Sequence, residues 1–69
     1  MKTCSAKDFA KILEKKGWVL VRINGSHHIY SKDGVEQKIS LPVHGNKSLK
    51  LGMQKFFMKV AQITDSDLI

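Results

Sequence analysis

Two turn signals in the middle of the chain most constrain its fold, because they divide that region into three short runs typical of strands. Residues 18–23 are rich in β-branched and aromatic side chains, which crowd a helix but pack well on a pleated surface. Asn24-Gly25-Ser26 interrupts this run, and Asp33-Gly34 is a strong signal for a two-residue hairpin turn. Residues 35–41 then alternate between apolar and polar types. We therefore predict three antiparallel strands joined by two hairpins, with residues 27–31 as the middle strand.

The alternation in the third run assigns one face of the sheet to a core and the other to water. The side chains expected to face the core are Val35, Ile39 and Leu41, and those expected to face water are Glu36, Lys38 and Ser40. Trp18 is also expected in the core, because an indole buries a large apolar area.

An amphipathic helix is predicted before the strands. Ser5, with Asp8 three residues later, resembles a capping box and predicts a helix that continues through Lys16. Apolar residues fall on one face of this helix and lysines on the other. Gly17 supplies the left-handed residue that commonly follows the last turn of a helix.

A second helix is predicted after Pro42, which ends the third strand and is followed by a polar loop. Ser48 is expected to cap this helix. Gly52 lies inside it, where glycine costs about 1 kcal/mol relative to alanine, so we expect Gly52 to permit a close contact. The apolar residues expected on its buried face are Leu49, Met53, Phe56, Phe57 and Val60.

These elements predict an α+β fold of one domain, residues 1–69. The order is α-β-β-β-α, and we expect a two-layer sandwich in which both helices cover one face of a three-stranded antiparallel sheet. The other face of the sheet is then open.

The balance of charges favours a phosphate-bearing or acidic partner. Twelve Lys and Arg residues oppose six Asp and Glu residues, giving a net charge of +6. Cys4 is the single cysteine, which excludes an intrachain disulfide and favours a cytoplasmic protein. We expect neither a signal peptide nor a membrane span, because no apolar run is long enough for either.

The segment Gly25-Ser26-His27-His28-Ile29-Tyr30 places two imidazoles at the junction of a loop and a strand. Histidine is the side chain whose ordinary pKa lies nearest neutrality, so it suits proton transfer. Together with Gly17-Trp18, Pro42-Val43-His44 and Lys50-Leu51-Gly52, this segment resembles the HicA toxins over nearly the whole chain. The resemblance implies an endoribonuclease that cleaves messenger RNA, a fold similar to the double-stranded-RNA-binding domain, and silencing by a HicB antitoxin.

The resemblance also implies a catalytic residue. In the family the catalytic histidine follows a Gly-Ser pair, which assigns the role to His27. Some members have one extra residue before the histidine, so His28 stays open as the alternative. Alternation along a strand sends the two rings to opposite faces of the sheet, and only one of those faces is open.

A lone imidazole is sufficient for cleavage that uses the 2′-hydroxyl of the RNA itself. His27 would take the proton of that hydroxyl, a contribution of roughly 10²–10⁴-fold when the base is well positioned. The mechanism requires neither a cofactor nor a metal. The residues expected to contact RNA or to stabilise charge on the phosphate are Arg22, Ser26, Lys38, Lys47 and Lys50.

Other classes of function stay open. His27, His28 and His44 supply three metal ligands, but no cysteine or acidic cluster completes a tetrahedral set, so we expect no metal site. A non-catalytic RNA-binding module would bind RNA in a salt-dependent way and leave it intact. An interaction protein that docks only onto an acidic partner would lack RNA affinity even at low salt. If the chain is a toxin, we expect an acidic antitoxin to cover the open sheet face around His27.

Overall fold

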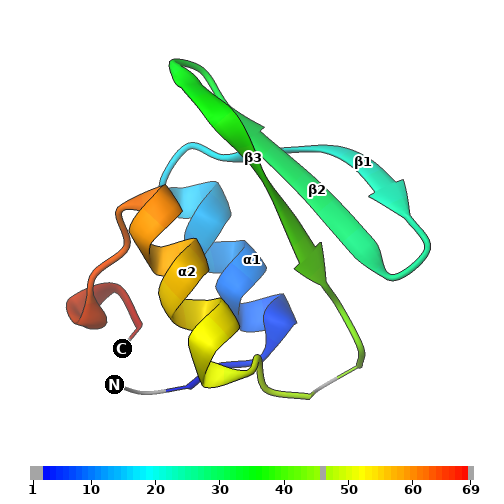
Figure 1. Cartoon of the computed structure of the whole chain (residues 1–69), viewed down its shortest axis with the longest axis vertical. Helices are drawn as coiled ribbons and strands as arrows, with labels where there is room; N and C mark the ends of the chain where they lie inside the picture. The colour runs from blue at the N-terminus through cyan, green and yellow to red at the C-terminus, as the bar shows by residue number, and fades with distance from the viewer. Residues whose placement is uncertain (1–2, 46, 69) are drawn as a thin grey trace.

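The predicted order of elements is confirmed by the computed structural model, which describes residues 3–45 and 47–68 (Figure 1). In these residues a helix precedes three strands, and a second helix and a short 3-10 helix follow them. The elements are α1 (Ala6–Lys15), β1 (Val19–Asn24), β2 (His27–Lys32), β3 (Val35–Pro42), α2 (Leu51–Ala61) and η1 (Asp65–Leu68). Within the described part of the chain, no helix has the length and apolar character needed to cross a membrane.

The sheet is antiparallel, with strand order β1-β2-β3. Gly25 and Gly34 lie in its two turns with φ of +62° and +83°, a conformation that glycine adopts without the cost it has for other residues. Both helices lie on one face of the sheet (Figure 1), and both contact β3. Every residue of β1 is exposed, so this edge strand extends beyond the cover that the helices provide.

The predictions for α1 are confirmed except at its end, because the helix stops at Lys15 and Lys16 is its C-cap. The Ser5 hydroxyl accepts a hydrogen bond from the backbone N–H of Asp8 at 3.2 Å, which caps the helix. Gly17 follows the last turn with φ of +94°. The backbone N–H of Trp18 then donates to the carbonyl of Leu13 at 3.0 Å, and the Trp18 side chain is buried. The buried face of α1 consists of Ala6, Phe9 and Leu13.

The core joins this face of α1 to β2, β3 and α2. The prediction for β3 holds, since Ile39 and Leu41 are buried and Val35 packs against them, while the polar residues between them are exposed. Tyr30 on β2 is opposite Ile39 and is also buried.

The predicted buried face of α2 is wrong in part. Phe57 is buried and Val60 is half-buried, as expected, but Phe56 is 53% exposed and Met53 is 38% exposed. The helix instead buries Gln54, Met58 and Ala61 beside Phe57. Residues 54, 57, 58 and 61 form one stripe at helical spacing, rotated from the predicted one.

A bond from Gln54 to the N-terminal segment accompanies this rotation. The Gln54 side-chain oxygen accepts a hydrogen bond from the backbone N–H of Cys4 at 3.1 Å. Burying an amide side chain without such a partner would cost about 1–3 kcal/mol. The side of α2 that faces the core therefore includes a polar residue, Gln54, whose side chain is hydrogen-bonded.

The start of α2 also differs from the prediction. Its N-cap is Lys50, which makes no side-chain capping bond, and Ser48 forms an isolated β-bridge with Ser5. The backbone N–H of Leu49 donates to the carbonyl of Cys4 at 2.9 Å, and Leu49 is buried as expected. Gly52 is exposed, and a Cβ added there would meet nothing within 4 Å, so the predicted close contact is absent.

Candidate active site

His27 is the first residue of β2, directly after the β1–β2 turn. It is opposite Asn24 of β1 and Pro42 of β3, so strands flank it on both sides. The backbone N–H of Val43 donates to the carbonyl of Ser26 at 2.8 Å and ties this turn to the end of β3. The backbone that carries the imidazole is therefore held from two directions.

The two histidines lie on opposite faces of the sheet. His28 is opposite Leu41, which is fully buried on the helix side, and His28 itself is half-buried. His27 is exposed and shares the uncovered face with Ile29, two residues further along β2. The predicted divergence of the rings is thus present, and of the two it is His27 that is open to a large ligand.

Ser40 on β3 fixes one nitrogen of the exposed ring. Nδ1 of His27 lies 3.0 Å from the Ser40 hydroxyl oxygen. In the neutral tautomer with its proton on Nδ1, that nitrogen donates to Ser40 and leaves Nε2 as an acceptor. In the other tautomer the serine donates to Nδ1 and Nε2 carries a proton. The pair therefore suits both acceptance and release of a proton at Nε2.

The alternation in the sequence places Ser40 on the water-facing side of β3 but indicates no functional role for it. Its position two residues before Pro42, the residue opposite His27, was the signal available for finding it. Using that signal requires the register between β2 and β3, which the turn alone does not determine.

Two of the predicted cationic residues share the uncovered face with His27. Arg22 of β1 is directly opposite Ile29, so the two side chains leave the sheet on the same side. Lys38 lies two residues before Ser40 on β3 and is exposed. The face therefore combines an imidazole, a hydroxyl and two cations.

The other predicted RNA contacts lie elsewhere. Ser26 is in the β1–β2 turn itself, next to His27, and is half-buried. Lys47 and Lys50 are exposed in the segment between β3 and α2, outside the sheet face that carries His27. Any role of these two lysines would involve RNA beyond the sheet.

The residues 3–45 and 47–68 contain no group of three His, Cys, Asp or Glu side chains arranged to hold a metal ion. His27 and His28 point to opposite faces, and His44 is exposed in the loop after β3. The three histidines named as potential ligands thus do not form one site.

A comparison with known families identifies the chain. The family model described as HicA toxin of bacterial toxin-antitoxin matches residues 6–63. The chain belongs to the HicA toxin family. No curated protein matches this HicA toxin.

The matched span begins at the first residue of α1 and ends two residues after α2. It includes the whole sheet and therefore both histidines, Ser40 and the two cations beside them. The family expected from the sequence is confirmed. This HicA toxin is therefore the toxin component of a toxin–antitoxin system, and its family pairs with antitoxins.

Proposed function

We propose that this HicA toxin is a metal-independent endoribonuclease that cleaves messenger RNA and uses His27 as its general acid and base. One observation carries the proposal: an exposed imidazole lies on the uncovered sheet face with its Nδ1 3.0 Å from the Ser40 hydroxyl. That bond orients the ring and leaves Nε2 for substrate. Membership of the HicA family supports the choice of RNA as substrate.

In the proposed reaction the 2′-hydroxyl of a ribose attacks the adjacent phosphorus. Nε2 of neutral His27 takes the hydroxyl proton while the new P–O bond forms. The bond from phosphorus to the 5′-oxygen of the next nucleotide breaks, and that oxygen takes the proton from Nε2, which returns His27 to its neutral form. The products are a 2′,3′-cyclic phosphate and a 5′-hydroxyl. A positioned base contributes roughly 10²–10⁴-fold to such a step.

Arg22 and Lys38 stabilise the negative charge that grows on the phosphoryl oxygens. Cations arranged before the reaction cost no reorganisation when that charge appears, which makes them effective at a transition state. Both residues belong to the face that carries His27. Ser26 contacts the RNA at the turn, and Lys47 and Lys50 contact phosphates outside the cleaved dinucleotide.

The antitoxin in this proposal is an acidic HicB-like protein that covers the sheet face around His27. A net charge of +6 favours an acidic partner, and complementary charge speeds and directs association. Covering the face would inhibit the toxin by excluding RNA, and it would leave the His27–Ser40 pair intact.

The decisive experiment compares His27→Ala with His28→Ala on single-stranded RNA in excess chelator. We expect His27→Ala to reduce cleavage by at least about 100-fold because the base is lost, while RNA binding measured by fluorescence anisotropy persists. His28→Ala is the matched control, since it removes a neighbouring imidazole and keeps the His27–Ser40 pair. Thermal unfolding of both variants checks that each is folded.

Two results would contradict the proposal. Loss of cleavage in folded His28→Ala with normal cleavage in His27→Ala would transfer the role to His28. Intact RNA after long incubation with the wild-type protein, combined with salt-dependent binding, would identify a non-catalytic RNA-binding module instead.

A further inference from the structure

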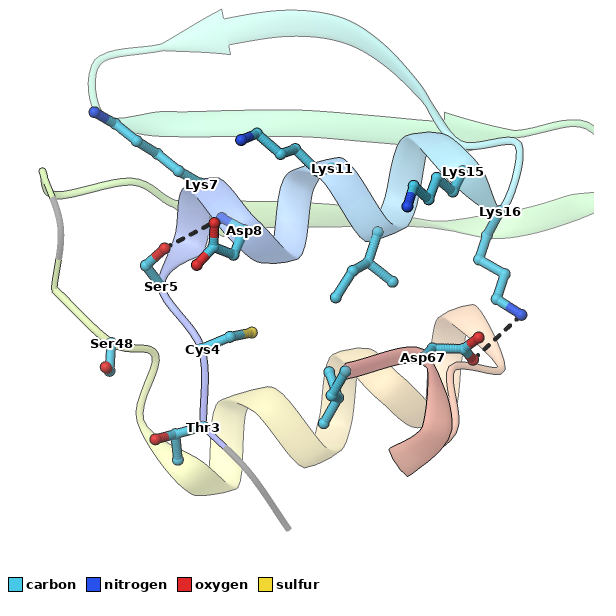
Figure 2. A pocket seen from close by; sticks show the side chains of 12 residues that line it. Thr3, Cys4, Ser5, Lys7, Asp8, Lys11, Lys15, Lys16, Ser48 and Asp67 are labelled. Carbon is cyan, nitrogen blue, oxygen red and sulfur yellow. Dashed lines mark hydrogen bonds and ion pairs between the residues drawn. The ribbon is translucent and has the colours of Figure 1, made fainter.

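A groove of about 860 Å³ lies along the outer side of α1, away from the sheet face that carries His27. The segment before α1 borders it at one end and η1 at the other (Figure 2). Most of the residues that line it are polar or charged, and the large aliphatic residues among them are Ile12 and Leu68. The proposed cleavage reaction makes no use of this region.

Three lysines follow the groove along α1, and we call Lys7, Lys11 and Lys15 the lysine row. Each is four residues after the one before, so each step advances about 6 Å along the helix axis. All three are exposed. Figure 2 shows their side chains spaced along α1 at the border of the groove. One extended polyanion lying in the groove can thus contact three cations in succession.

The other charges in the groove leave the lysine row with a positive excess. Nζ of Lys16 lies 3.2 Å from a carboxylate oxygen of Asp67, so these two charges balance each other at the η1 end. Asp8 is the remaining acid of the lining, and it is in the first turn of α1, where a negative charge is favourable. Apart from the Lys16–Asp67 pair, the groove therefore carries three positive charges and one negative charge.

The start of the row lies toward the same end of the molecule as His27. In both figures the start of α1 is the end nearer the β1–β2 turn. Hydrogen bonds support this arrangement: the turn is bonded to Val43 after β3, and Leu49, further along the same loop, is bonded to Cys4 just before α1. RNA leaving the sheet face at this end would meet Lys7 first.

We propose that the lysine row binds the phosphate backbone of the single-stranded RNA that flanks the bond cleaved at His27. This inference rests on the proposed function. Rows of lysine suit phosphates, which receive most of the contacts in protein–nucleic acid complexes. A protein partner fits less well, because lysine is depleted in protein interfaces and large apolar side chains are enriched in their cores. Among the described residues, the exposed large aliphatic side chains lie elsewhere, four of them on β1 and Leu51 on α2.

The test measures how RNA binding depends on salt in the full chain carrying His27→Ala, so that the RNA stays intact. Lys11→Gln/Lys15→Gln removes two charges of the row. Lys55→Gln/Lys59→Gln is the matched control, with the same charge loss at the same spacing on the exposed side of α2. Glutamine and lysine have similar helix propensities, so both helices should persist.

The probe is a fluorescent single-stranded RNA, and the readout is the slope of log K against log salt concentration. We expect Lys11→Gln/Lys15→Gln to flatten this slope by about 1.4, because each phosphate contact on a single strand contributes about 0.7. The control should change it by much less. An equal change in both variants, or none in either, would overturn the inference. So would normal RNA binding combined with loss of antitoxin binding, which would make the row a protein contact.

Cleavage with His27 present separates this inference from the proposed function. Lys11→Gln/Lys15→Gln should cleave a dinucleotide at the wild-type rate, because a dinucleotide is too short to reach the row, and should cleave long RNA more slowly. A slope that flattens as expected in a protein without nuclease activity would overturn the proposed function while supporting RNA binding at the row. Cleavage of long RNA at the wild-type rate would overturn the inference alone.

Discussion

At the scale of single residues, the sharpest prediction concerns the pairing of His27 with Ser40. The serine acts through the ring, as a positioning residue, because its hydroxyl lies 3.0 Å from Nδ1. A single hydrogen bond of this kind contributes about 0.5–1.5 kcal/mol. We therefore expect Ser40→Ala to lower kcat by about 2- to 12-fold with little change in KM, because the ring is less well oriented.

Ser40→Thr is the matching variant, since threonine keeps the hydroxyl and favours strands. It should restore kcat. Ser40 is exposed, so neither change should disturb the core. An unchanged kcat in Ser40→Ala, or an equal loss of kcat in Ser40→Thr, would show that the hydroxyl does not position the ring.

At this scale the sequence was sufficient to place His27 and His28 on opposite faces of the sheet. It was not sufficient to place Ser40 beside His27. The period of two along a strand separates the two rings whatever the register. Placing Ser40 requires the β2–β3 register, and this shifts between Tyr30 and Lys32. Lys32 is opposite Val35, so an unbroken ladder would set Tyr30 opposite Gln37, whereas the irregularity sets it opposite Ile39. Nothing in the residue types announces that shift.

The helices show why one amphipathic pattern was predicted well and the other was not. α1 has a single apolar face with lysines opposite it, so its orientation was unambiguous. α2 carries apolar residues on two adjacent faces, and periodicity alone does not choose between them. The buried face is the one that includes Gln54, whose bond to Cys4 joins segments fifty residues apart. A contact of that range has no local signature.

At the scale of one helix, we predict how Gly52→Ala changes stability. Gly52 is exposed in α2, its φ is not positive, and a Cβ there meets nothing within 4 Å. Alanine should therefore raise the free energy of unfolding by about 0.4–1 kcal/mol, mainly by restricting the unfolded chain. Urea denaturation followed by circular dichroism measures this change.

Gly17→Ala supplies the contrast, because φ at Gly17 is +94° and alanine is strained there. It should destabilise the protein by more than Gly52→Ala stabilises it. Destabilisation by Gly52→Ala would show that this glycine is needed after all, as the sequence analysis expected.

Across the whole molecule, three surfaces have different chemistry. The uncovered sheet face carries the imidazole and two cations, and the lysine row lies on the helix layer. β1 exposes Val19, Val21 and Ile23 by 51–60% because it extends beyond the helices. Val19 is opposite Ser31 and Ile23 is opposite His28, so these two side chains leave β1 on different faces of the sheet. We propose that the antitoxin that covers His27 also contacts Val19 on the same face of the sheet.

Asp67 links η1 to α1, and its charge gives this contact a dependence on pH. A carboxylate oxygen of Asp67 accepts a hydrogen bond from the backbone N–H of Thr64 at 2.8 Å and pairs with Lys16 at 3.2 Å. The Thr64 bond, and then Lys16, hold the pKa of Asp67 below its ordinary value. A carboxyl group whose pKa is lower in the folded protein stabilises it above the unfolded pKa of about 3.9. That stabilisation is lost as the pH falls through the folded pKa.

We therefore expect Asp67→Asn to be less stable than the wild type at pH 7, and the difference to shrink below about pH 4, where the wild-type carboxylate takes up a proton. Urea denaturation of both proteins from pH 7 to pH 2.5 measures that difference. Lys16→Gln should show a smaller loss at pH 7, because it keeps the Thr64 bond, which is the larger cause of the lowered pKa. A difference between wild type and Asp67→Asn that stays constant with pH would mean that the charge of Asp67 does not contribute to holding η1 against α1.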